Sequence, residues 1–303
     1  MRFFNISDLH FGKLLYGYDL TEEHRNFIEQ LGDYCDKYNP DAVLIAGDVY
    51  DRSVPSADAM TLLDELLNKL SGRKVFIISG NHDNAKRLSF GKDFLKKHDI
   101  YISTVSQTGE DEKIEKVTFA DEYGNVNIYM LPFLKPALFK NSMPEEAAAG
   151  EDAIIKKLVE NTDIDKNERN IILAHQFFVS GHKEPELCES EQTPAIVGGL
   201  DAVDVSAFDD FEYAALGHIH GGQFVGSEKN RYSGTPIKFS VSERNHNNNI
   251  VMVDMEEKNK EIEITKLPLT QIRDVKKLTG YFDDIIASAD EELKNDSVSI
   301  TLM

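Results

Sequence analysis

Five short segments of the chain share one arrangement, in which a run of β-branched or aromatic residues leads into aspartate, asparagine or histidine. The runs are Arg2–Ile6, Ala42–Ile45, Val75–Ile78, Asn170–Leu173 and Glu212–Leu216. Runs of this length, bounded by small residues, predict buried strands. Helical patterns at Glu22–Lys37 and Ser56–Leu70 separate the first three. We therefore expect strands alternating with helices, which indicates an α/β fold.

Beyond residue 100 the pattern changes to a series of short strands. Segments Ile114–Ala120 and Val126–Leu131 flank a Tyr-Gly-Asn turn and predict a hairpin, and a helical pattern covers Ala147–Glu160. Further strands are expected at Gln223–Gly226, Arg231–Ser233, Asn249–Met255 and Glu261–Lys266. These late strands predict a second, more antiparallel sheet. Two packed mixed sheets with helices outside would form a four-layer α-β-β-α sandwich.

A Leu-Pro-Leu sequence at 267–269 marks an expected boundary between two domains. Residues 1–266 would hold both sheets, and residues 267–303 would begin an α+β capping domain. In this second part we expect a strand at Ile272–Lys276, a helix at Tyr281–Ser288 and a strand at Ser297–Leu302. Because the chain stops inside the last strand, we expect the capping domain to be truncated.

The residues that follow the five apolar runs are of the types that bind divalent metals. They are Asp8, His10, Asp48, Asn81, His175, His218 and His220, with His82 as one further histidine. In α/β sheets ligands bind beyond the carboxyl ends of the strands, so the five ends can meet at one crevice. The sequence therefore predicts a metal site assembled from distant parts of the chain.

The spacing of these residues favours two ions over one. Asp8 and His10, like His218 and His220, are two residues apart, which is about 6.6 Å in an extended chain. Two neighbouring ions need a shared carboxylate, and Asp48, which follows a glycine at a strand end, is suitably exposed. The mixture of carboxylate, imidazole and amide oxygen favours Mn²⁺, Fe²⁺ or Zn²⁺, with Mg²⁺ less at home.

The other four histidines are expected to play no part in this site, and both cysteines are expected to be free thiols. The histidines interpreted as surface residues are His24 and His98 in helical contexts and His182 and His246 in polar loops. Cys35 and Cys188 lie far apart, without the spacing of a CxxC motif or a zinc ribbon. This arrangement predicts two free thiols.

The net charge of the chain is −20, from 33 basic and 53 acidic residues, which disfavours non-specific DNA binding by the whole surface. Residues 73–97 differ, with seven basic and two acidic residues. They form either a local basic surface or a solvated helix face near Lys86–Lys97. No apolar run approaches the ~20 residues that span a bilayer, and we expect a cytoplasmic protein without a signal peptide.

Five motifs together resemble the full motif set of the calcineurin-like metallophosphoesterases. They are Asp8-Leu9-His10, Gly47-Asp48-Val49-Tyr50-Asp51-Arg52, Gly80-Asn81-His82-Asp83, Ala174-His175 and Gly217-His218-Ile219-His220. Longer versions of three of them are similar to the SbcD family of bacterial nuclease subunits. So are Val197-Gly198-Gly199-Leu200-Asp201 and Tyr232-Ser233-Gly234-Thr235-Pro236-Ile237-Lys238-Phe239-Ser240. The likeness covers essentially the whole chain.

The resemblance implies a role for each motif residue. One ion, with Mn²⁺ expected first, would be held by Asp8, His10, Asp48 and His220, and the other by Asp48, Asn81, His175 and His218. Outside the metal shell, His82 would stabilise or protonate the departing 3′ oxygen while hydroxide attacks phosphorus. Asp51 would orient His82, and Arg52 would touch phosphate. As an alternative, Asp83 would orient His82 or cap the following helix.

The resemblance also implies a DNA repair nuclease, acting as an exonuclease on duplex ends and as an endonuclease on single strands and hairpins. Such proteins work as homodimers with an SbcC-like ATPase in the cytoplasm, associated with the nucleoid. The segment that docks on the ATPase is expected to be absent from this chain. Candidate contacts with the DNA backbone are Lys13, Arg52, Lys86, Arg87, Lys238 and Arg244.

Two other functions fit parts of this pattern. A phosphatase or cyclic-nucleotide phosphodiesterase would use the same metal chemistry, but with a closed pocket for a small ester in place of an open groove for DNA. A non-catalytic binding scaffold predicts an incomplete ligand set, whereas every expected ligand position is filled in this sequence.

Overall fold

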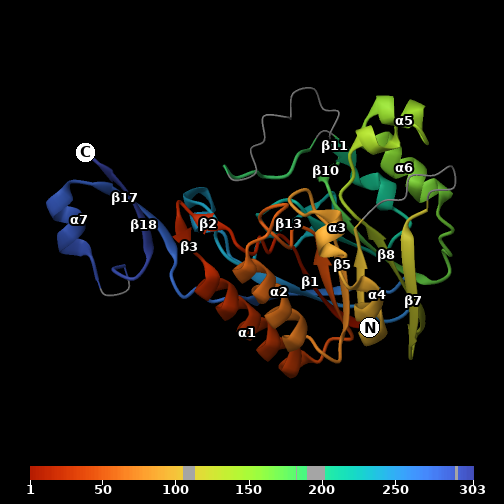
Figure 1. Ribbon diagram of the computed structural model, residues 1–303, viewed down its shortest axis with the longest axis horizontal. Coiled ribbons are helices and arrows are strands. Elements are labelled where there is room, and N and C mark those ends of the chain that lie inside the picture. The colour runs from red at the N-terminus through yellow and green to blue at the C-terminus, as the bar shows by residue number, and fades with distance from the viewer. Residues whose placement is uncertain (105–112, 182, 190–201, 291–292) are drawn as a thin grey trace.

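The computed structural model describes residues 1–104, 113–181, 183–189, 202–290 and 293–303. Within these residues two six-stranded mixed sheets pack face to face, and helices cover both outer faces (Figure 1). This is the four-layer α-β-β-α sandwich expected from the sequence. His182 and the Val197–Asp201 motif lie outside the described residues.

The first sheet has the strand order β16-β15-β1-β4-β5-β6. Its four parallel strands are β1 (Arg2–Ile6), β4 (Ala42–Ala46), β5 (Lys74–Ile78) and β6 (Ile100–Ser103). Its two antiparallel strands are β15 (Asn249–Asp254) and β16 (Glu263–Pro268). The sequence did not predict β6.

Side chains of the first sheet alternate between two cores, as the pleat of a strand requires. On β4, Val43 and Ile45 face α1 (Thr21–Tyr38) and α2 (Ala57–Lys69), while Leu44 points toward the second sheet. The apolar faces of α1 and α2 bury these outward side chains, so the first sheet is covered on both sides.

The second sheet has the order β13-β14-β12-β9-β8-β7. Its strands are β7 (Glu115–Asp121), β8 (Gly124–Leu131), β9 (Arg169–His175), β12 (Tyr213–Gly217), β13 (Gln223–Val225) and β14 (Ser227–Tyr232). The expected hairpin is present as β7 and β8. The pairs β8–β9, β9–β12 and β12–β14 are parallel, so this sheet is as mixed as the first.

The expected second sheet was therefore wrong in two respects. It is no more antiparallel than the first sheet, and β15 and β16 do not belong to it. Instead β15 returns to pair with β1, with Phe3 opposite Val253. Strand partners are chosen by tertiary packing, which a local sequence pattern does not encode.

Two expected helices are interrupted at glycines with positive φ. The pattern at Ala147–Glu160 forms α5 (Pro144–Ala149) and α6 (Glu151–Asn161), which meet at Gly150 with a φ of 114°. The basic stretch Lys86–Lys97 is not one helix face. It forms α3 (Ala85–Leu88), α4 (Lys92–Leu95) and the 3₁₀ turn η1 (Lys96–His98), with Gly91 at a φ of 74° before α4.

The C-terminal residues form a small unit at one end of the molecule, beyond β2 (Leu14–Leu15) and β3 (Tyr18–Asp19) (Figure 1). Strand β17 (Val275–Gly280), helix α7 (Phe282–Ser288) and the parallel strand β18 (Ser297–Leu302) compose it. The first strand begins three residues later than expected. Strand β16 runs through Pro268, past the boundary expected after residue 266, and the division into two domains remains a prediction.

Short elements complete the described chain. They are β10 (Phe177–Val179), β11 (Ala202–Asp204) and the 3₁₀ turns η2 (Pro136–Phe139), η3 (Val205–Phe208) and η4 (Val241–Asn245). Among the described residues we find no helix that is both long and apolar enough to cross a membrane.

One of the four histidines expected at the surface lies in the core instead. His24 is 1% exposed, and its two ring nitrogens lie 2.9 Å from the carbonyl oxygens of Leu20 and Leu9. His98 is exposed as expected, and His246 is half-buried. Cys35 and Cys188 are free thiols, as predicted, and both are buried.

Candidate metal centre

The loops that leave β1 and β4 run side by side and carry the first ligand-type residues. Beyond the strands, Asp8 N–H donates to the Gly47 carbonyl at 3.0 Å, and His10 N–H donates to the Asp48 carbonyl at 2.9 Å. These bonds extend the parallel pairing of the two strands past their ends. The backbone therefore places Asp8, His10 and Asp48 together, as the sequence predicted.

Four of the ligand-type residues have backbone conformations that side chains rarely adopt. Asp8, His10, Asp48 and His218 have φ values of 54°, 45°, 51° and 104°. Non-glycine residues with positive φ cost of order 1–3 kcal/mol each and cluster at functional sites. Because four such residues lie in one site, we infer that their side-chain directions are maintained although their backbone conformations are unfavourable.

Glycines let the five strand ends approach one another. A Cβ added to Gly217 would lie 1.9 Å from the Ala46 carbonyl oxygen, and one added to Gly80 would lie 2.1 Å from Asp48 Oδ1. These contacts join β12 and β5 to the end of β4. The small residues before the ligand-type side chains are therefore required by close backbone packing.

The first group of ligand-type side chains comprises Asp8, His10 and His220, all buried. The two imidazoles face each other, with His10 Nε2 3.3 Å from His220 Nε2. Asp48 Oδ2 lies 3.8 Å from His10 Nε2. Three elements far apart in the sequence thus bring four potential metal-binding side chains to one point.

The second group is centred on Asn81. Its Oδ1 atom lies 3.0 Å from both His175 Nε2 and His218 Nδ1. Asp48 Oδ2 is 3.4 Å from His175 Nε2, so this carboxylate faces both groups. Asp8 also lies near both, because it accepts the His218 N–H and belongs to a cluster with Asp48 and His175.

Burial and the charges of neighbouring groups shift the pKa values of the two carboxylates. Burial raises the pKa of Asp8 to about 6, partly opposed by the charge of His175. Burial also acts to raise the pKa of Asp48, but the charge and hydrogen bond of His175 outweigh it and hold that pKa below its usual range. In the reciprocal direction, burial lowers the pKa of His175, yet Asp48 outweighs this and raises it to about 9.

The pKa values of the other three imidazoles shift in different directions in the same environment. Burial lowers the pKa of His10 well below its ordinary value, and burial together with the charge of His175 lowers that of His218 to about 3. Burial acts to lower the pKa of His220 too, but hydrogen bonds with Cys188 and Glu243 outweigh it and raise that pKa. Neutral imidazoles such as His10 and His218 are the form that binds metals.

The donor set fits divalent cations. The carboxylates of Asp8 and Asp48 lie together in this buried site and repel each other, and cations held between them would compensate that repulsion. The ring atom His10 Nδ1 is buried without a hydrogen-bond partner, 3.8 Å from Asp51 Oδ1. Carboxylate, amide and imidazole donors suit Mn²⁺, Fe²⁺ or Zn²⁺.

His82 lies beside these groups and, like His218 but unlike His10, His175 and His220, is only partly buried. Its ring packs edge-on against His10, with centroids 4.8 Å apart. His82 Nδ1 lies 2.7 Å from the backbone carbonyl of Asp51, so that carbonyl orients the ring. The Asp51 carboxylate instead pairs with Lys13 at 2.9 Å and lies 3.5 Å from Arg52 Nε.

Asp83 takes neither of the roles suggested for it. Its carboxylate accepts three backbone N–H bonds, from Gly80 at 2.9 Å, Val49 at 3.1 Å and Tyr50 at 2.9 Å. Asn84, not Asp83, caps α3. Asp83 therefore clamps the loop after β5 to the loop after β4, while the His82 N–H donates to Asp48 Oδ1 at 2.9 Å.

The candidate DNA contacts are not equally available. Arg52, Lys86, Arg87 and Arg244 are exposed, and Lys13 is half-buried in its pair with Asp51. Lys238 is buried, and its Nζ donates to the Arg244 carbonyl at 2.8 Å and to Asp274 at 2.7 Å. Its ammonium group therefore links η4 to the C-terminal unit and is not presented to DNA.

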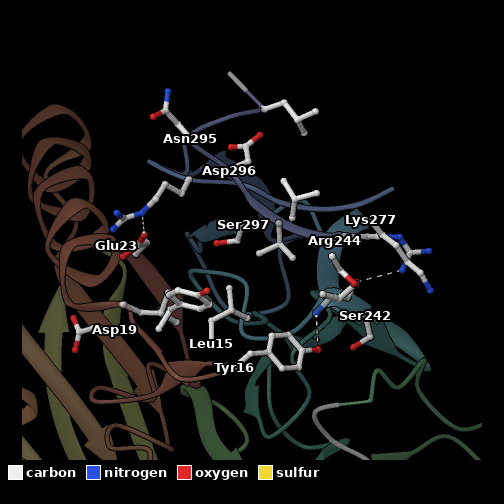
Figure 2. A pocket seen from close by; sticks show the side chains of 18 of the residues that line it. Leu15, Tyr16, Asp19, Glu23, Ser242, Arg244, Lys277, Asn295, Asp296 and Ser297 are labelled. Atoms are coloured by element: carbon white, nitrogen blue, oxygen red, sulfur yellow. Dashed lines mark hydrogen bonds and ion pairs between the residues drawn. The ribbon is translucent and has the colours of Figure 1, made fainter. Parts of the chain in front are cut away.

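A cavity of about 970 Å³ lies between the β2–β3 hairpin, η4 and the C-terminal unit (Figure 2). Tyr16, Arg244 and Lys277 line it, together with the acidic side chains Glu23 and Asp296. Tyr16 Oη accepts the Val241 N–H at 3.4 Å. None of the seven ligand-type residues is in the described lining, so this cavity is separate from the site above.

Comparison with known proteins identifies the family. A family model described as calcineurin-like phosphoesterase matches residues 1–222. The chain belongs to this family. All seven ligand-type residues and His82 of this phosphoesterase fall inside the matched range. Membership makes it a hydrolase of phosphoester bonds that uses divalent metal ions.

Individual relatives of this phosphoesterase are similar over most of its length. The SbcD component of the nuclease SbcCD from Staphylococcus epidermidis is 29% identical over 291 residues, covering 94% of this chain and 74% of the relative. Among solved structures, GAP50, the anchor in the inner membrane complex of Plasmodium, has a TM-score of 0.47 at 10% identity, covering 89% of each chain. A dimetal phosphatase from Danio rerio has a TM-score of 0.46 at 12% identity, covering 89% of this chain and 97% of its own.

One residue of this site was not predicted from the sequence. Glu243, on η4, is wholly buried, and its Oε1 lies 2.9 Å from His220 Nδ1. It follows no apolar strand, and its immediate neighbours Ser242 and Arg244 are polar, so no local pattern singles it out.

Proposed function

We propose that this phosphoesterase is a two-metal nuclease of the SbcD type, which hydrolyses phosphodiester bonds of DNA at duplex ends, single strands and hairpins. The observation that carries the proposal is the convergence of the seven ligand-type residues in two groups with Asp48 between them, and with His82 beside them and partly exposed. The likeness to a named component of the SbcCD nuclease over 94% of the chain supports DNA as the substrate.

The residues are suited to hold two ions, with Mn²⁺ expected first. Asp8, His10, Asp48 and His220 would hold one, and Asp48, Asn81, His175 and His218 the other. When bound, such ions neutralise charge on phosphate and make hydroxide available near neutral pH. Two divalent ions would supply about four positive charges where the phosphate lies, and Asp8 and Asp48 would serve there as ligands. The net charge of −20 therefore does not exclude DNA as a substrate.

The chain's own residues would orient the substrate and move a proton. With Nδ1 held by the Asp51 carbonyl, the Nε2 atom of His82 is left to act on the departing 3′ oxygen. General acid catalysis of this kind contributes typically ~10²–10⁴ in rate. Arg52 is exposed next to Asp51 and is suited to contact a phosphate.

DNA would reach the site over the exposed cations Lys86, Arg87 and Arg244, with Lys13 nearer the metals. Arg244 also lines the cavity of Figure 2, whose described lining holds four basic and four acidic side chains, so this cavity adds no net positive charge to the path. We include an SbcC-like ATPase, a homodimer and a cytoplasmic, nucleoid-associated location in the proposal on the strength of the family resemblance.

Substrate choice tests the proposal directly. The purified chain should cleave linear duplex and hairpin DNA with Mn²⁺, and lose this activity with EDTA. His82→Gln should lower turnover by about 10²–10⁴ while both Mn²⁺ ions still bind, because His82 lies outside the ligand set. Parallel loss of metal and activity in His82→Gln would remove His82 from its role. Rapid hydrolysis of small phosphate esters or cyclic nucleotides without cleavage of DNA would favour the alternative enzyme class.

The DNA path has its own test. The double variant Lys86→Glu/Arg87→Glu should bind DNA more weakly and flatten the dependence of affinity on salt, because fewer counterions are released. The matched control is Lys156→Glu/Lys157→Glu, which reverses the same charge on the exposed face of α6. Equal salt slopes for both variants would exclude Lys86 and Arg87 from the contact surface.

A further inference from the structure

The carboxylate of Glu243 is one of the most enclosed charged groups in the described chain. It is 0% exposed, on the short turn η4. Burying a carboxylate is unfavourable unless it is paired and hydrogen-bonded. The position therefore calls for an explanation from the groups around it.

Both oxygens of Glu243 have defined partners. Oε1 lies 2.9 Å from His220 Nδ1, and Oε2 accepts the backbone N–H of Phe239 at 2.9 Å. Ser240 Oγ and Cys188 Sγ are also near Oε1, at 3.5 Å and 3.8 Å. The carboxylate thus fixes His220 on one side and its own chain segment on the other.

The contact with His220 determines what the imidazole can do at its opposite nitrogen. A carboxylate at Nδ1 requires the proton to be on Nδ1, so the lone pair of Nε2 is free. That Nε2 atom lies 3.3 Å from His10 Nε2, within the first ligand group. A carboxylate partner also makes the imidazole a stronger ligand.

We propose that Glu243 is a positioning residue, which fixes the tautomer and direction of His220 toward the ion held by Asp8, His10, Asp48 and His220. This inference rests on the proposed two-metal site. It assigns Glu243 to this ion because Glu243 contacts His220 Nδ1, and the opposite ring nitrogen of His220 faces His10. In this role Glu243 acts through His220, with which it also forms a group of potential ligands that includes Cys188.

The test compares Mn²⁺ binding by the full chain and two variants, measured by calorimetry. In Glu243→Gln the shape is kept, but the amide can accept only one of the two N–H bonds and the charge is lost. We expect one Mn²⁺ to bind about 10–100-fold more weakly and the other to bind unchanged, which is the range for loss of such a partner. Nuclease activity of Glu243→Gln should recover at saturating Mn²⁺, which a folding defect would not allow.

The matched control is Glu212→Gln, at the opposite end of β12. Glu212 also accepts a backbone N–H, from Asn170 at 2.6 Å, and pairs with Lys258. The Glu212→Gln variant should bind both ions with the affinities of the unaltered protein. Wild-type affinity at both sites in Glu243→Gln, or the same loss in Glu212→Gln, would overturn the inference.

A measurement on the unaltered protein decides the matter if Glu243→Gln fails to fold. Nitrogen NMR of the Zn²⁺-loaded chain should show His220 protonated at Nδ1, and a proton at Nε2 would refute the assignment. A chain that binds two ions with these properties but leaves DNA intact would refute the nuclease while leaving the role of Glu243 standing.

Discussion

Asp83 offers a sharp test of how the two motif loops are fastened together. In Asp83→Ala three backbone N–H groups, of Gly80, Val49 and Tyr50, lose their acceptor. In Asp83→Asn the amide oxygen can replace Oδ2, which serves Gly80 and Val49, but the amide NH2 group then faces the Tyr50 N–H, so two donors are unsatisfied. Both variants remove the same buried charge, and its desolvation cancels between them. The difference is therefore one unsatisfied donor, or about 1–3 kcal/mol.

Urea unfolding of the EDTA-treated protein measures this difference, because metal binding would otherwise add to stability. Asp83→Ala should have the lower free energy of unfolding by the stated amount. Asp93→Ala, an exposed position on α4, is the control and should change stability by less than about 0.5 kcal/mol. Equal stabilities for Asp83→Ala and Asp83→Asn would show that Asp83 does not clamp the loops, and the reasoning from its hydrogen bonds would fail.

Two further predictions concern metal uptake and close packing. Since the pKa of Asp8 is raised to about 6 by burial, and that of His175 to about 9 by Asp48 against the effect of burial, both hold protons near pH 6. Mn²⁺ affinity should therefore rise from pH 6 to pH 9, and binding should release more protons at the lower pH. Calorimetry in buffers of different ionisation enthalpy measures both the affinity and the number of protons released. An affinity that does not change with pH would contradict the prediction. Gly217→Ala should lower the free energy of unfolding by about 1–3 kcal/mol or more, because its Cβ would meet the Ala46 carbonyl at 1.9 Å. Gly221→Ala is the control, because its Cβ would make only ordinary contacts, and its free energy of unfolding should be nearly unchanged. Thermal and urea unfolding measure both variants. Similar losses of stability in the two would argue against the close approach of Gly217 to Ala46.

The local part of the fold was predictable, whereas the choice of strand partners was not. β1, β4, β5, β9 and β12 are short apolar runs that are buried on both faces, which is the clearest signal a parallel strand gives. The return of β15 to β1 depends on packing between segments about 250 residues apart, and no periodicity encodes it. The breaks at Gly91 and Gly150 were visible as glycines, but only their positive φ shows that the helices stop there.

The candidate site was likewise predictable only in part. Residues that directly follow strands were brought together as predicted, because parallel strands end at a common edge. Glu243 was missed because it lies on a 3₁₀ turn without an apolar run before it. His24 was misplaced although a signal existed: it precedes Phe27, Ile28 and Leu31 by three, four and seven residues, which puts it on the buried face of α1.

Because β1 lies between β4 and β15 in the first sheet, it cannot complete its pairing until β15 has been synthesised. During synthesis β1 leaves the ribosome long before β15, and until then one of its edges is without its partner. The ligand-type residues are themselves distributed from Asp8 to His220, so the last of them also emerges late. Contacts this distant along the chain form slowly. Under the proposed assignment of ligands, a nascent chain gains its last metal ligand only once His220 has emerged, after most of this sequence has been translated.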